Sequence, residues 1–477
     1  MIDLRQIEKY RENNRIEAKK ALGGLPHSIW ETYSAFANTL GGIILLGVEE
    51  YRDKTLHTVD LPDPEGLVAE FFRLLSDPRK ASVNILTPRD VKITRVNGDR
   101  IIIINVPRAD RTQKPVFVDG SIANTYRRNG EGDYRCTEEE RGAMLRDAAL
   151  KTQDMRVLEK TPMSVFNLSS VRGYRWQMRL SRPDHVWEKL KDEDFLLRLG
   201  AAGKGADGRT HPTAAGLLMF GKEKDIVREF PEYSLRYDSE IDDPLPLKDT
   251  VSYIHEEAGG NVFDFCFRAF GRLRGDVAAL ASGTDAAPVY KAVREALTNC
   301  LVNADYCGRG GVSVLRRENA MIMSNPGVFR IELNAAKSGG VSDPRNGTLL
   351  KMFNLIDMSE RVGSGIPNIY RVWREHGWVD PVITQSERPD RTTIALSFKK
   401  RGARRSRAGE NALLIAEKRK NAVAEYLTYK VSADLSELSK ALKLSPSRTK
   451  PILQKLEDEG VLVFEGDGES RIYKLKS

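Results

Sequence analysis

Over the first 150 residues, hydrophobic and polar positions form strand-like and helix-like patterns in turn. Two continuous apolar runs of strand length, at 43–48 and 100–106, predict strands that are covered on both faces. Between them, residues 64–75 carry apolar side chains at the spacing of an amphipathic helix. The segment 115–130 has the pattern of a further pair of strands, and a glutamate-rich helix follows it. We therefore predict an α/β domain over residues 1–150.

The middle of the chain carries weaker signals and then a second clear α/β pattern. A compact apolar run at 213–220 and a short alternating segment after it predict a connecting α/β region over residues 151–284. A helix that begins near Pro288 and strand-like runs between 312 and 323 follow. These elements predict a second compact α/β domain over residues 285–400.

The C-terminal segment, residues 410–477, has the pattern of a winged helix. Its residues 412–427, 435–442 and 446–459 are helical by spacing, and the third helix opens with a proline at a tolerated first-turn position. Two strands joined by a Gly-Asp-Gly turn follow. A run of Lys and Arg at 401–409 reads as a solvated linker that can also contact phosphate. The predicted fold class is thus α/β multidomain with a C-terminal winged helix-turn-helix.

Length and composition narrow the class of protein. The 477 residues exceed what one hydrophobic core organises, and 40% hydrophobic with 30% charged residues is typical of a globular chain. No apolar run reaches the roughly 20 residues of a membrane helix, so we expect a cytoplasmic chain without a membrane partner. The four cysteines lack CxxC spacing and are expected to be buried thiols. A net charge of +8 favours a polyanionic partner in a general way.

Carboxylates near the N-terminus are the first candidate site. Glu12 and Glu17 cannot lie one above the other on a single ideal helix, but Asn13 and Asn14 supply a break between helix and strand. If the strand that ends at Glu49 neighbours the strand at 16–19, a third carboxylate arrives at the same end of the sheet. We therefore expect the three acids to converge.

A converging acid cluster needs a positive partner, because its charges repel one another. A hard cation with oxygen ligands, Mg²⁺ or Mn²⁺, is the natural occupant, and it could activate water against a phosphodiester while Lys19 stabilises charge. The residues leave an alternative open. The same acids can be surface groups that flank a strand, with Glu49 and Glu50 paired to Arg52 or Lys54.

The N-terminal motifs resemble the Schlafen domain, also called the AlbA-type domain. The acids, Glu-x-Lys at 17–19, Ser-Ala-Phe-Ala-Asn at 34–38, Gly-Gly at 41–42 and Gly-Val-acid at 47–49 occur in the family order, and the resemblance covers about residues 5–145. It implies, in nuclease members, that acids like the three above bind metal and cleave transfer or ribosomal RNA. We expect the arginine pair Arg127 and Arg128, in the motif that closes the resemblance, to contact the nucleic-acid backbone.

Two departures distinguish this chain from those nucleases. The third acid is a glutamate where they carry an aspartate, and Ala18 replaces the usual aromatic residue of the Glu-Phe-Lys motif. Many bacterial relatives carry similar acids without being known nucleases. Nucleic-acid binding without cleavage therefore stands beside metal-dependent cleavage as a reading of this domain.

A polar stripe on an otherwise apolar helix is the second candidate site. Glu295, Asn299 and Asn303 are spaced at i, i+4 and i+8 and share one helix face. A glutamate can polarise water, and an asparagine can ligate a magnesium-bound triphosphate. Downstream, 324–327 ends a strand, and 360–366 offers backbone amides just before a helix, where phosphate binds readily. The candidate nucleotide-binding residues are Glu295, Asn299, Asn303, Asn325, Gly327, Gly363, Ser364 and Gly365.

These three blocks together resemble the ATP-binding fold of the GHKL class, shared by gyrases, Hsp90 and histidine kinases. The resemblance is to a divergent branch found behind Schlafen-type domains in bacterial proteins often labelled transcriptional regulators or RecG-like helicases, and it runs over about 200–400. It implies ATP as a ligand. The adenine-reading aspartate of the class is not evident, because 325–327 occupies its place, and Asn303-Ala304 stands where branch members often have His-Arg. A helicase motor is rejected, since no GxxxxGK[ST] loop occurs.

The predicted winged helix carries the third candidate site. The start and middle of its recognition helix expose polar side chains suited to phosphate and base-edge contacts in a major groove. The candidate residues are Ser447, Arg448, Lys450 and Gln454, with Arg471 and Lys474 on the wing. Acidic residues in the same module leave open a winged helix used only for protein contact or dimerisation.

The combined hypothesis is a nucleotide-gated endoribonuclease. A Schlafen-like domain would bind RNA, such as transfer RNA, or DNA and cut RNA with Mg²⁺ or Mn²⁺, while ATP in the GHKL-like domain controls it. The alternative is a non-enzymatic transcriptional regulator, in which ATP occupancy alters DNA binding by the winged helix. A homodimer is expected in either case.

Overall fold

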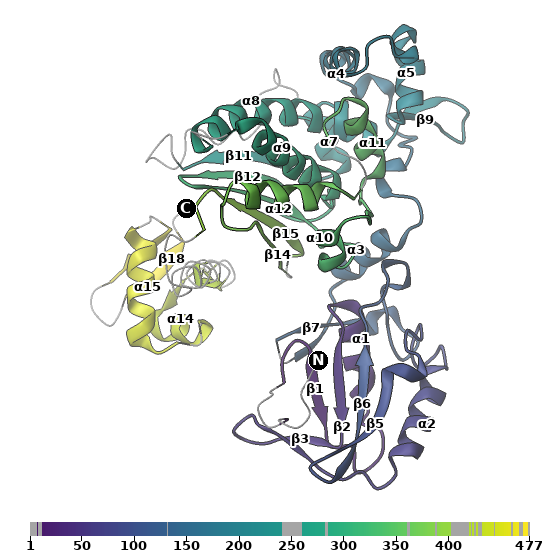
Figure 1. Cartoon of the computed structure of the whole chain (residues 1–477), viewed down its shortest axis with the longest axis vertical. Helices are drawn as coiled ribbons and strands as arrows, with labels where there is room; N and C mark the ends of the chain where they lie inside the picture. The colour runs from purple at the N-terminus through teal and green to yellow at the C-terminus, as the bar shows by residue number, and fades with distance from the viewer. Residues whose placement is uncertain are drawn as a thin grey trace. The chain divides into compact units, whose positions relative to one another are not determined.

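The computed structural model describes residues 7, 12–130, 132–240, 260–281, 285–359, 363–386, 389–401, 419–420, 422–423, 426–427, 432–442, 444–458, 461–466 and 471–475. The chain divides into two compact units, Met1–Lys399 and Lys400–Ser477 (Figure 1). Each unit is described by itself below.

The N-terminal part of the first unit contains a four-stranded sheet with the order β1-β2-β6-β5 (Figure 1). Strands β1 and β2 are parallel, and the other neighbours are antiparallel. The bounds are β1 Ile16–Lys19, β2 Gly42–Leu46, β5 Val91–Val96 and β6 Asp99–Val106. The apolar run predicted as one strand at 43–48 is broken at Gly47, where φ is +79°. The chain then starts β3 (Val48–Glu50), which pairs with β4 (Leu56–Thr58).

Two helices supply most of the apolar surface that packs on this sheet. Helix α1 spans Ile29–Asn38, and α2 spans Pro64–Leu75, as the apolar spacing predicts. Asp63 accepts a hydrogen bond from Gly66 N and so caps the start of α2. Trp30 of α1 stacks on Phe71 of α2 with the ring centroids 5.4 Å apart. The core of the domain therefore lies between the helices and the sheet.

The pair of strands predicted in 115–130 is only partly correct. Strand β7 (Tyr126–Asn129) forms and pairs with β8 (Gly132–Arg135), before helix α3 (Glu138–Ala148). Residues 115–118 form isolated bridges instead of a strand. The reason is that side chains satisfy this backbone: Asn38 Oδ1 accepts from Val116 N, and Ser82 Oγ accepts from Phe117 N.

The region that follows consists of short elements around the aromatic side chains of Tyr174, Phe195, Phe220 and Phe263. It contains α4 Leu168–Ser181, α5 Asp192–Leu199, β9 Ala202–Lys204, β10 Thr210–Pro212, α6 Ala214–Phe220 and α7 Glu223–Glu229. The apolar run at 213–220 is therefore a helix, and every residue of α6 is buried.

A five-stranded sheet with the order β11-β12-β13-β15-β14 forms the rest of the first unit. Its bounds are β11 Leu235–Ser239, β12 Val312–Arg317, β13 Ala320–Pro326, β14 Val382–Ser386 and β15 Arg391–Ser397. The edge strand β11 pairs in parallel with β12 although the sequence analysis assigned it to the connecting region. The boundary predicted at 284/285 therefore cuts through one sheet.

Helices cover one face of this sheet, as Figure 1 shows for α8, α9 and α12. Helix α9 packs on β12 and β13, and both α8 and α12 pack on α9. Their bounds are α8 Val262–Leu280, α9 Ala286–Asn303 and α12 Gly365–Glu375, and two further helices are α10 Leu333–Ser338 and α11 Gly347–Leu355. None of the helices in the described ranges is both long and apolar enough to cross a membrane.

Among its described residues, the second unit contains a short strand, two helices with defined bounds, helical residues between 419 and 427, and a β-hairpin. The elements are β16 Ala433–Asp434, α14 Leu435–Ala441, α15 Pro446–Asp458, β17 Leu462–Glu465 and β18 Ile472–Leu475. Their small core includes Leu438, Leu453 and Tyr473. The helix predicted at 412–427 falls mostly outside the described residues, as does most of the basic run at 401–409.

The cysteines are free thiols, as the sequence indicates, but they are not all buried. Cys136, Cys266 and Cys300 are buried, and burial raises the pKa of Cys300 to about 12. Cys307 is exposed. The prediction of a buried thiol is therefore wrong at Cys307.

Asn38 is expected to be a main stabilising residue of the N-terminal domain. Its side-chain amide donates to Val116 O (2.7 Å) and Tyr126 O (3.0 Å) and accepts from Val116 N (2.9 Å). Replacing Asn38 by Ala leaves these buried groups without partners and should lower the free energy of unfolding by roughly 2–4 kcal/mol. Chemical denaturation measures the change. The control Asn129→Ala, at an exposed position of β7, should change it by less than about 0.5 kcal/mol.

Candidate functional site

The acids at the N-terminus do not converge as expected: Glu12 precedes β1, and Glu17 lies within β1 opposite Ile44 of β2. Because β2 ends at Leu46 and Gly47 turns the chain, Glu49 and Glu50 belong to the separate strand β3. Glu49 pairs at the surface with Lys20 Nζ at 3.0 Å. Glu50 is the less exposed of the two and pairs with Lys54 at 3.0 Å.

Glu50, rather than Glu49, lies within electrostatic range of Glu12. Burial raises the pKa of Glu12, and the negative charges of Glu17 and Glu50 raise it further. A hydrogen bond from the backbone of Ala18 lowers this pKa in part. That bond, from Ala18 N to Glu12 Oε1, is 2.9 Å long. Glu50 therefore acts on Glu12 electrostatically, whereas Glu49 is paired with Lys20. Alternation along the strand after Gly47 is the sequence signal that identifies this residue.

Arg128 neutralises the centre of this cluster. Its side chain is 1% exposed, and its guanidinium contacts Glu17 Oε2 at 2.8 Å and Asp133 Oδ1 at 2.9 Å. It also donates to the carbonyl oxygen of Asn13 at 3.0 Å. On the other side, Lys19 Nζ lies 2.9 Å from Glu17 Oε1. The carboxylate of Glu17 is thus held between two cations.

This arrangement does not fit the expected divalent ion. Within the part of the chain that the structure describes, no group of three or more His, Cys, Asp and Glu side chains is placed to hold a metal. The expected cage of Glu12, Glu17 and Glu49 is not formed, because Glu17 is engaged by Arg128 and Lys19 and Glu49 by Lys20. We therefore derive no metal-dependent step at this cluster.

The arginine pair expected to contact nucleic acid is buried. Arg127 contacts Asp390 Oδ1 at 2.8 Å and Glu140 Oε1 at 3.7 Å, and it is 6% exposed. Arg128 faces the acid cluster described above. Both guanidinium groups have carboxylate partners within the protein, and their contact with nucleic acid stays a prediction.

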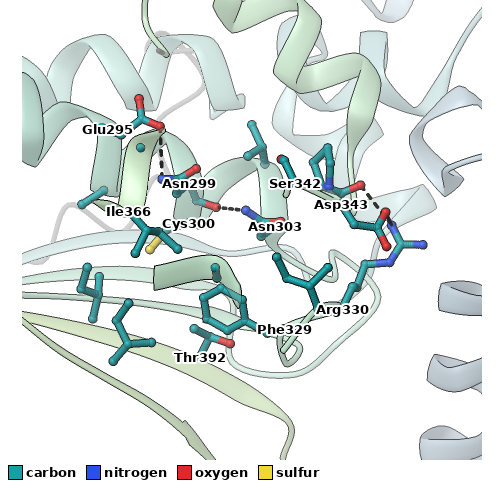
Figure 2. Close-up of a pocket in the computed structure, with 18 of the residues that line it drawn as sticks. Glu295, Asn299, Cys300, Asn303, Phe329, Arg330, Ser342, Asp343, Ile366 and Thr392 are labelled. Atoms are coloured by element: carbon teal, nitrogen blue, oxygen red, sulfur yellow. Dashed lines mark hydrogen bonds and ion pairs between the residues drawn. The ribbon is translucent and has the colours of Figure 1, made fainter. Parts of the chain in front are cut away.

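The polar stripe of α9 lies along a pocket, as Figure 2 shows. Asn299 Nδ2 donates to Glu295 Oε1 at 3.3 Å, and Asn303 Nδ2 donates to the carbonyl oxygen of Asn299 at 2.9 Å. Glu295 is buried, whereas Asn299 and Asn303 are partly exposed. The stripe therefore orders three polar side chains on one wall of a cavity.

Two glycines bring backbone close to this stripe. Gly363 has φ of +79°, a conformation that disfavours other residues. Gly365 opens α12, and a Cβ built on it would lie 2.1 Å from Glu295 Oε1. The carboxylate of Glu295 thus lies beside the start of α12, the positive end of the helix dipole.

Six of the eight predicted nucleotide-binding residues line this pocket. They are Glu295, Asn299, Asn303, Asn325, Gly363 and Gly365. Gly327 does not line it, and its missing side chain instead leaves room for Arg345, whose Nη1 would lie 2.5 Å from a Cβ. Ser364 precedes α12 without capping it through its side chain. The pocket encloses about 1050 Å³ including the open solvent at its mouth.

Sequence reasoning missed the opposite wall of the pocket. It comes from the segments after β13 and before α11 and from β15, and includes Phe329, Arg330, Ser342, Asp343 and Thr392 (Figure 2). Asp343 Oδ1 lies 3.7 Å from Arg330 Nη1, and its other oxygen pairs with Arg111 of the N-terminal domain. No local pattern marks these residues, because only the fold brings them opposite α9.

The helix α15 presents its predicted contact residues at the surface. Ser447, Arg448, Lys450 and Gln454 are exposed, whereas Thr449 is buried. In the hairpin, Arg471 lies 4.0 Å over the ring of Phe464, and Lys474 pairs with Glu465 at 2.7 Å. The polar face of α15 is therefore available to a partner.

Comparison with known families assigns three segments of the chain. The model of the Schlafen AlbA_2 family matches residues 12–137. The model of a domain of unknown function, DUF8451, matches residues 142–236. The model described as "Putative ATP-dependent DNA helicase recG C-terminal" matches residues 310–396, so the stripe of α9 lies just before it.

The solved structures that are similar to this chain include two that cover different shares of it. One is the DIP2311 protein from Corynebacterium diphtheriae, with 17% identity over 97% of this chain and 95% of that chain and a TM-score of 0.38. The other is the N-terminal domain of a putative ATP-dependent DNA helicase RecG-related protein from Nitrosomonas europaea. It is 33% identical over 28% of this chain and 90% of that chain, with a TM-score of 0.23. No curated protein gives a significant match.

The chain is therefore a mixed α/β multidomain protein that combines an AlbA_2 domain with an ATPase-like domain. The match of residues 12–137 to the AlbA_2 family identifies it as a Schlafen-like protein.

Arg128 and Glu17 should be strongly coupled in stability. Arg128→Met leaves Glu17 and Asp133 without their buried partner and should lower the free energy of unfolding by about 3–5 kcal/mol. Adding Glu17→Gln should recover part of that loss, because it removes one uncompensated charge. Urea unfolding at neutral pH measures both variants. Arg79→Met, which removes an exposed pair with Asp77, is the control and should change little. The coupling would be contradicted if the double variant lost as much free energy of unfolding as Arg128→Met and Glu17→Gln lose together as single variants.

Proposed function

We propose that this protein is a nucleotide-responsive nucleic-acid-binding regulator. In this proposal, ATP binds beside α9 in a GHKL-like domain. The AlbA_2 domain and a winged helix formed by the second unit bind RNA or DNA. ATP occupancy changes the affinity for nucleic acid by shifting the populations of two conformations.

The observation that carries the proposal is the pocket of Figure 2. It places the carboxylate and two amides of the α9 stripe on one wall and the start of α12 beside it. Amide and carboxylate oxygens suit a magnesium-bound triphosphate, and helix amides suit phosphate oxygens. Apolar side chains such as Phe329, Ile369 and Ile394 give the cavity a surface for a nucleobase. The family match of residues 310–396 to a RecG C-terminal domain supports a nucleotide ligand.

The nucleic-acid part of the proposal has separate support. The AlbA_2 match, the net charge of +8 and the exposed Arg448 and Lys450 of α15 all favour a phosphate-rich partner. A helicase motor is not part of the proposal, since the chain carries no GxxxxGK[ST] loop.

Regulation without cleavage is preferred over the endoribonuclease hypothesis. A divalent ion at the acid cluster would need Glu17 as a ligand, but Arg128 and Lys19 already engage both oxygens of that carboxylate. Displacing a buried guanidinium from its carboxylates costs several kcal/mol. The acid cluster is therefore better explained as a structural ion-pair network that supports β1 and β7.

Asn299 provides the direct test of the nucleotide site. Asn299→Leu keeps a helix-compatible side chain of similar size but removes the amide at the centre of the stripe. We expect the affinity for ATP and Mg²⁺, measured by calorimetry, to fall at least tenfold. The matched control is Asn334→Leu on the exposed face of α10. This variant should leave the affinity for ATP and Mg²⁺ unchanged. In mobility-shift assays, ATP should alter nucleic-acid binding by the wild type and not by Asn299→Leu. Equal ATP affinity in the two variants would refute this site.

Cleavage assays test the preference against a nuclease. Wild type and Glu12→Ala/Glu17→Ala are incubated with transfer RNA and Mn²⁺, and the products are resolved on denaturing gels. We expect the RNA to remain intact with both proteins, because the acid cluster is held by ion pairs. Cleavage by the wild type that disappears in the double variant would restore the endoribonuclease hypothesis.

A further inference from the structure

Two partly buried cations of the N-terminal domain lack a counter-ion. Arg108 Nη2 donates to the carbonyl oxygen of Phe329 at 2.5 Å, and Lys114 Nζ donates to the carbonyl oxygen of Asn38 at 2.7 Å. Among the described residues, neither has a carboxylate within ion-pair distance. Arg108 keeps four further N–H groups and Lys114 two, so both retain donors for another partner.

Both side chains line one cavity, in which the positive charge is concentrated. The cavity encloses about 770 Å³ including the open solvent at its mouth. Arg111, Arg127 and Arg330 also line it, and each of these is paired with a carboxylate. Among the described residues of the lining, Asp147 and Asp390 are the only acids, and they belong to those pairs. The charges left without a match are therefore those of Arg108 and Lys114.

The unmatched charges have a physical cost in the free protein. Burial lowers the pKa of Lys114 well below its usual value, and Arg108 and Arg127 lower it further. Burial also lowers the pKa of Arg108, with Glu332 acting in the opposite direction from beyond ion-pair distance. An anion that entered the cavity would remove this cost, because buried charges are stabilised by a partner of opposite sign.

We propose that this cavity binds the phosphate group of a small phosphorylated molecule, with Arg108 and Lys114 as its direct ligands. A phosphate monoester carries between one and a half and two negative charges at neutral pH, roughly the charge of the two unmatched cations. Its three terminal oxygens can accept from both side chains at once. Leu40, Met144 and Phe329 offer apolar surface for the organic part.

This site is distinct from the nucleotide pocket beside α9. The two cavities share only Val328, Phe329 and Arg330, which form the wall between them. None of the residues of the α9 stripe lines the phosphate cavity. The proposal therefore stands or falls independently of the proposed function.

Calorimetry on the full chain tests the site, with inorganic phosphate and ribose 5-phosphate as probes. We expect saturable binding, with ribose 5-phosphate binding more tightly because of the apolar surface. Lys114→Met and Arg108→Gln should each weaken both probes about tenfold, since each removes a charged hydrogen-bond donor. Circular dichroism checks the fold, and if one variant is unfolded the other carries the test.

Two controls separate the site from general electrostatics and from the α9 pocket. Lys92→Met and Arg95→Gln make the same changes at exposed positions of β5 and should leave binding unaltered. Asn299→Leu should also leave phosphate binding unaltered. Affinity that is unchanged in both Lys114→Met and Arg108→Gln, or that falls equally in the β5 controls, would overturn the proposal. Loss in Asn299→Leu alone would assign the phosphate to the α9 pocket and also overturn it.

Discussion

The buried guanidinium of Arg128 is the interaction on which the N-terminal domain depends. It connects β7 to the start of β1 through Glu17 and the carbonyl oxygen of Asn13, and to β8 through Asp133. It also lies 5.3 Å from the ring centroid of Phe36 in α1, so one side chain joins the strands to the helix. The same guanidinium neutralises Glu17. Arg128 therefore both stabilises the domain and keeps the Glu17 carboxylate from binding a metal ion.

A second buried ion-pair network joins the N-terminal domain to the ATPase-like domain within the first unit. Arg345 makes a two-pronged contact with both oxygens of Asp147, each at 2.8 Å. Burial alone would raise the pKa of Asp147, but Arg345 and Arg330 hold it below its usual value. Arg111 and Arg330 each donate to the carbonyl oxygen of Asp147 at 2.7 Å. The end of α3 is therefore fixed to the segments that line the nucleotide pocket.

The sequence predicted the elements whose pattern is local and missed what depends on tertiary contacts. Helix α2 and the α9 stripe follow from 3.6-residue periodicity, and both lie where that periodicity places them. The position of Glu50 depended on the break at Gly47, which has a positive φ and where a Cβ would lie 2.9 Å from Val59 O and Leu61 Cγ. The partner of Glu17 lies more than a hundred residues away, so no spacing rule could identify Arg128. The wall around Phe329 was missed for the same reason.

The shared wall of the two cavities in the first unit offers a route for energetic coupling if both bind ligands. Their common wall contains Arg330, which contacts Asp343 on the nucleotide side and Asp147 on the other. Arg111 also reaches Asp343, so a ligand phosphate that attracted either arginine would weaken its pair with that aspartate. Coupling between two binding sites is reciprocal. If bound nucleotide changes the affinity for the phosphorylated molecule by some factor, that molecule changes the affinity for nucleotide by the same factor. The physical basis of such a coupling would be competition for a few arginine–carboxylate pairs, which can exchange partners without any rearrangement of the sheet.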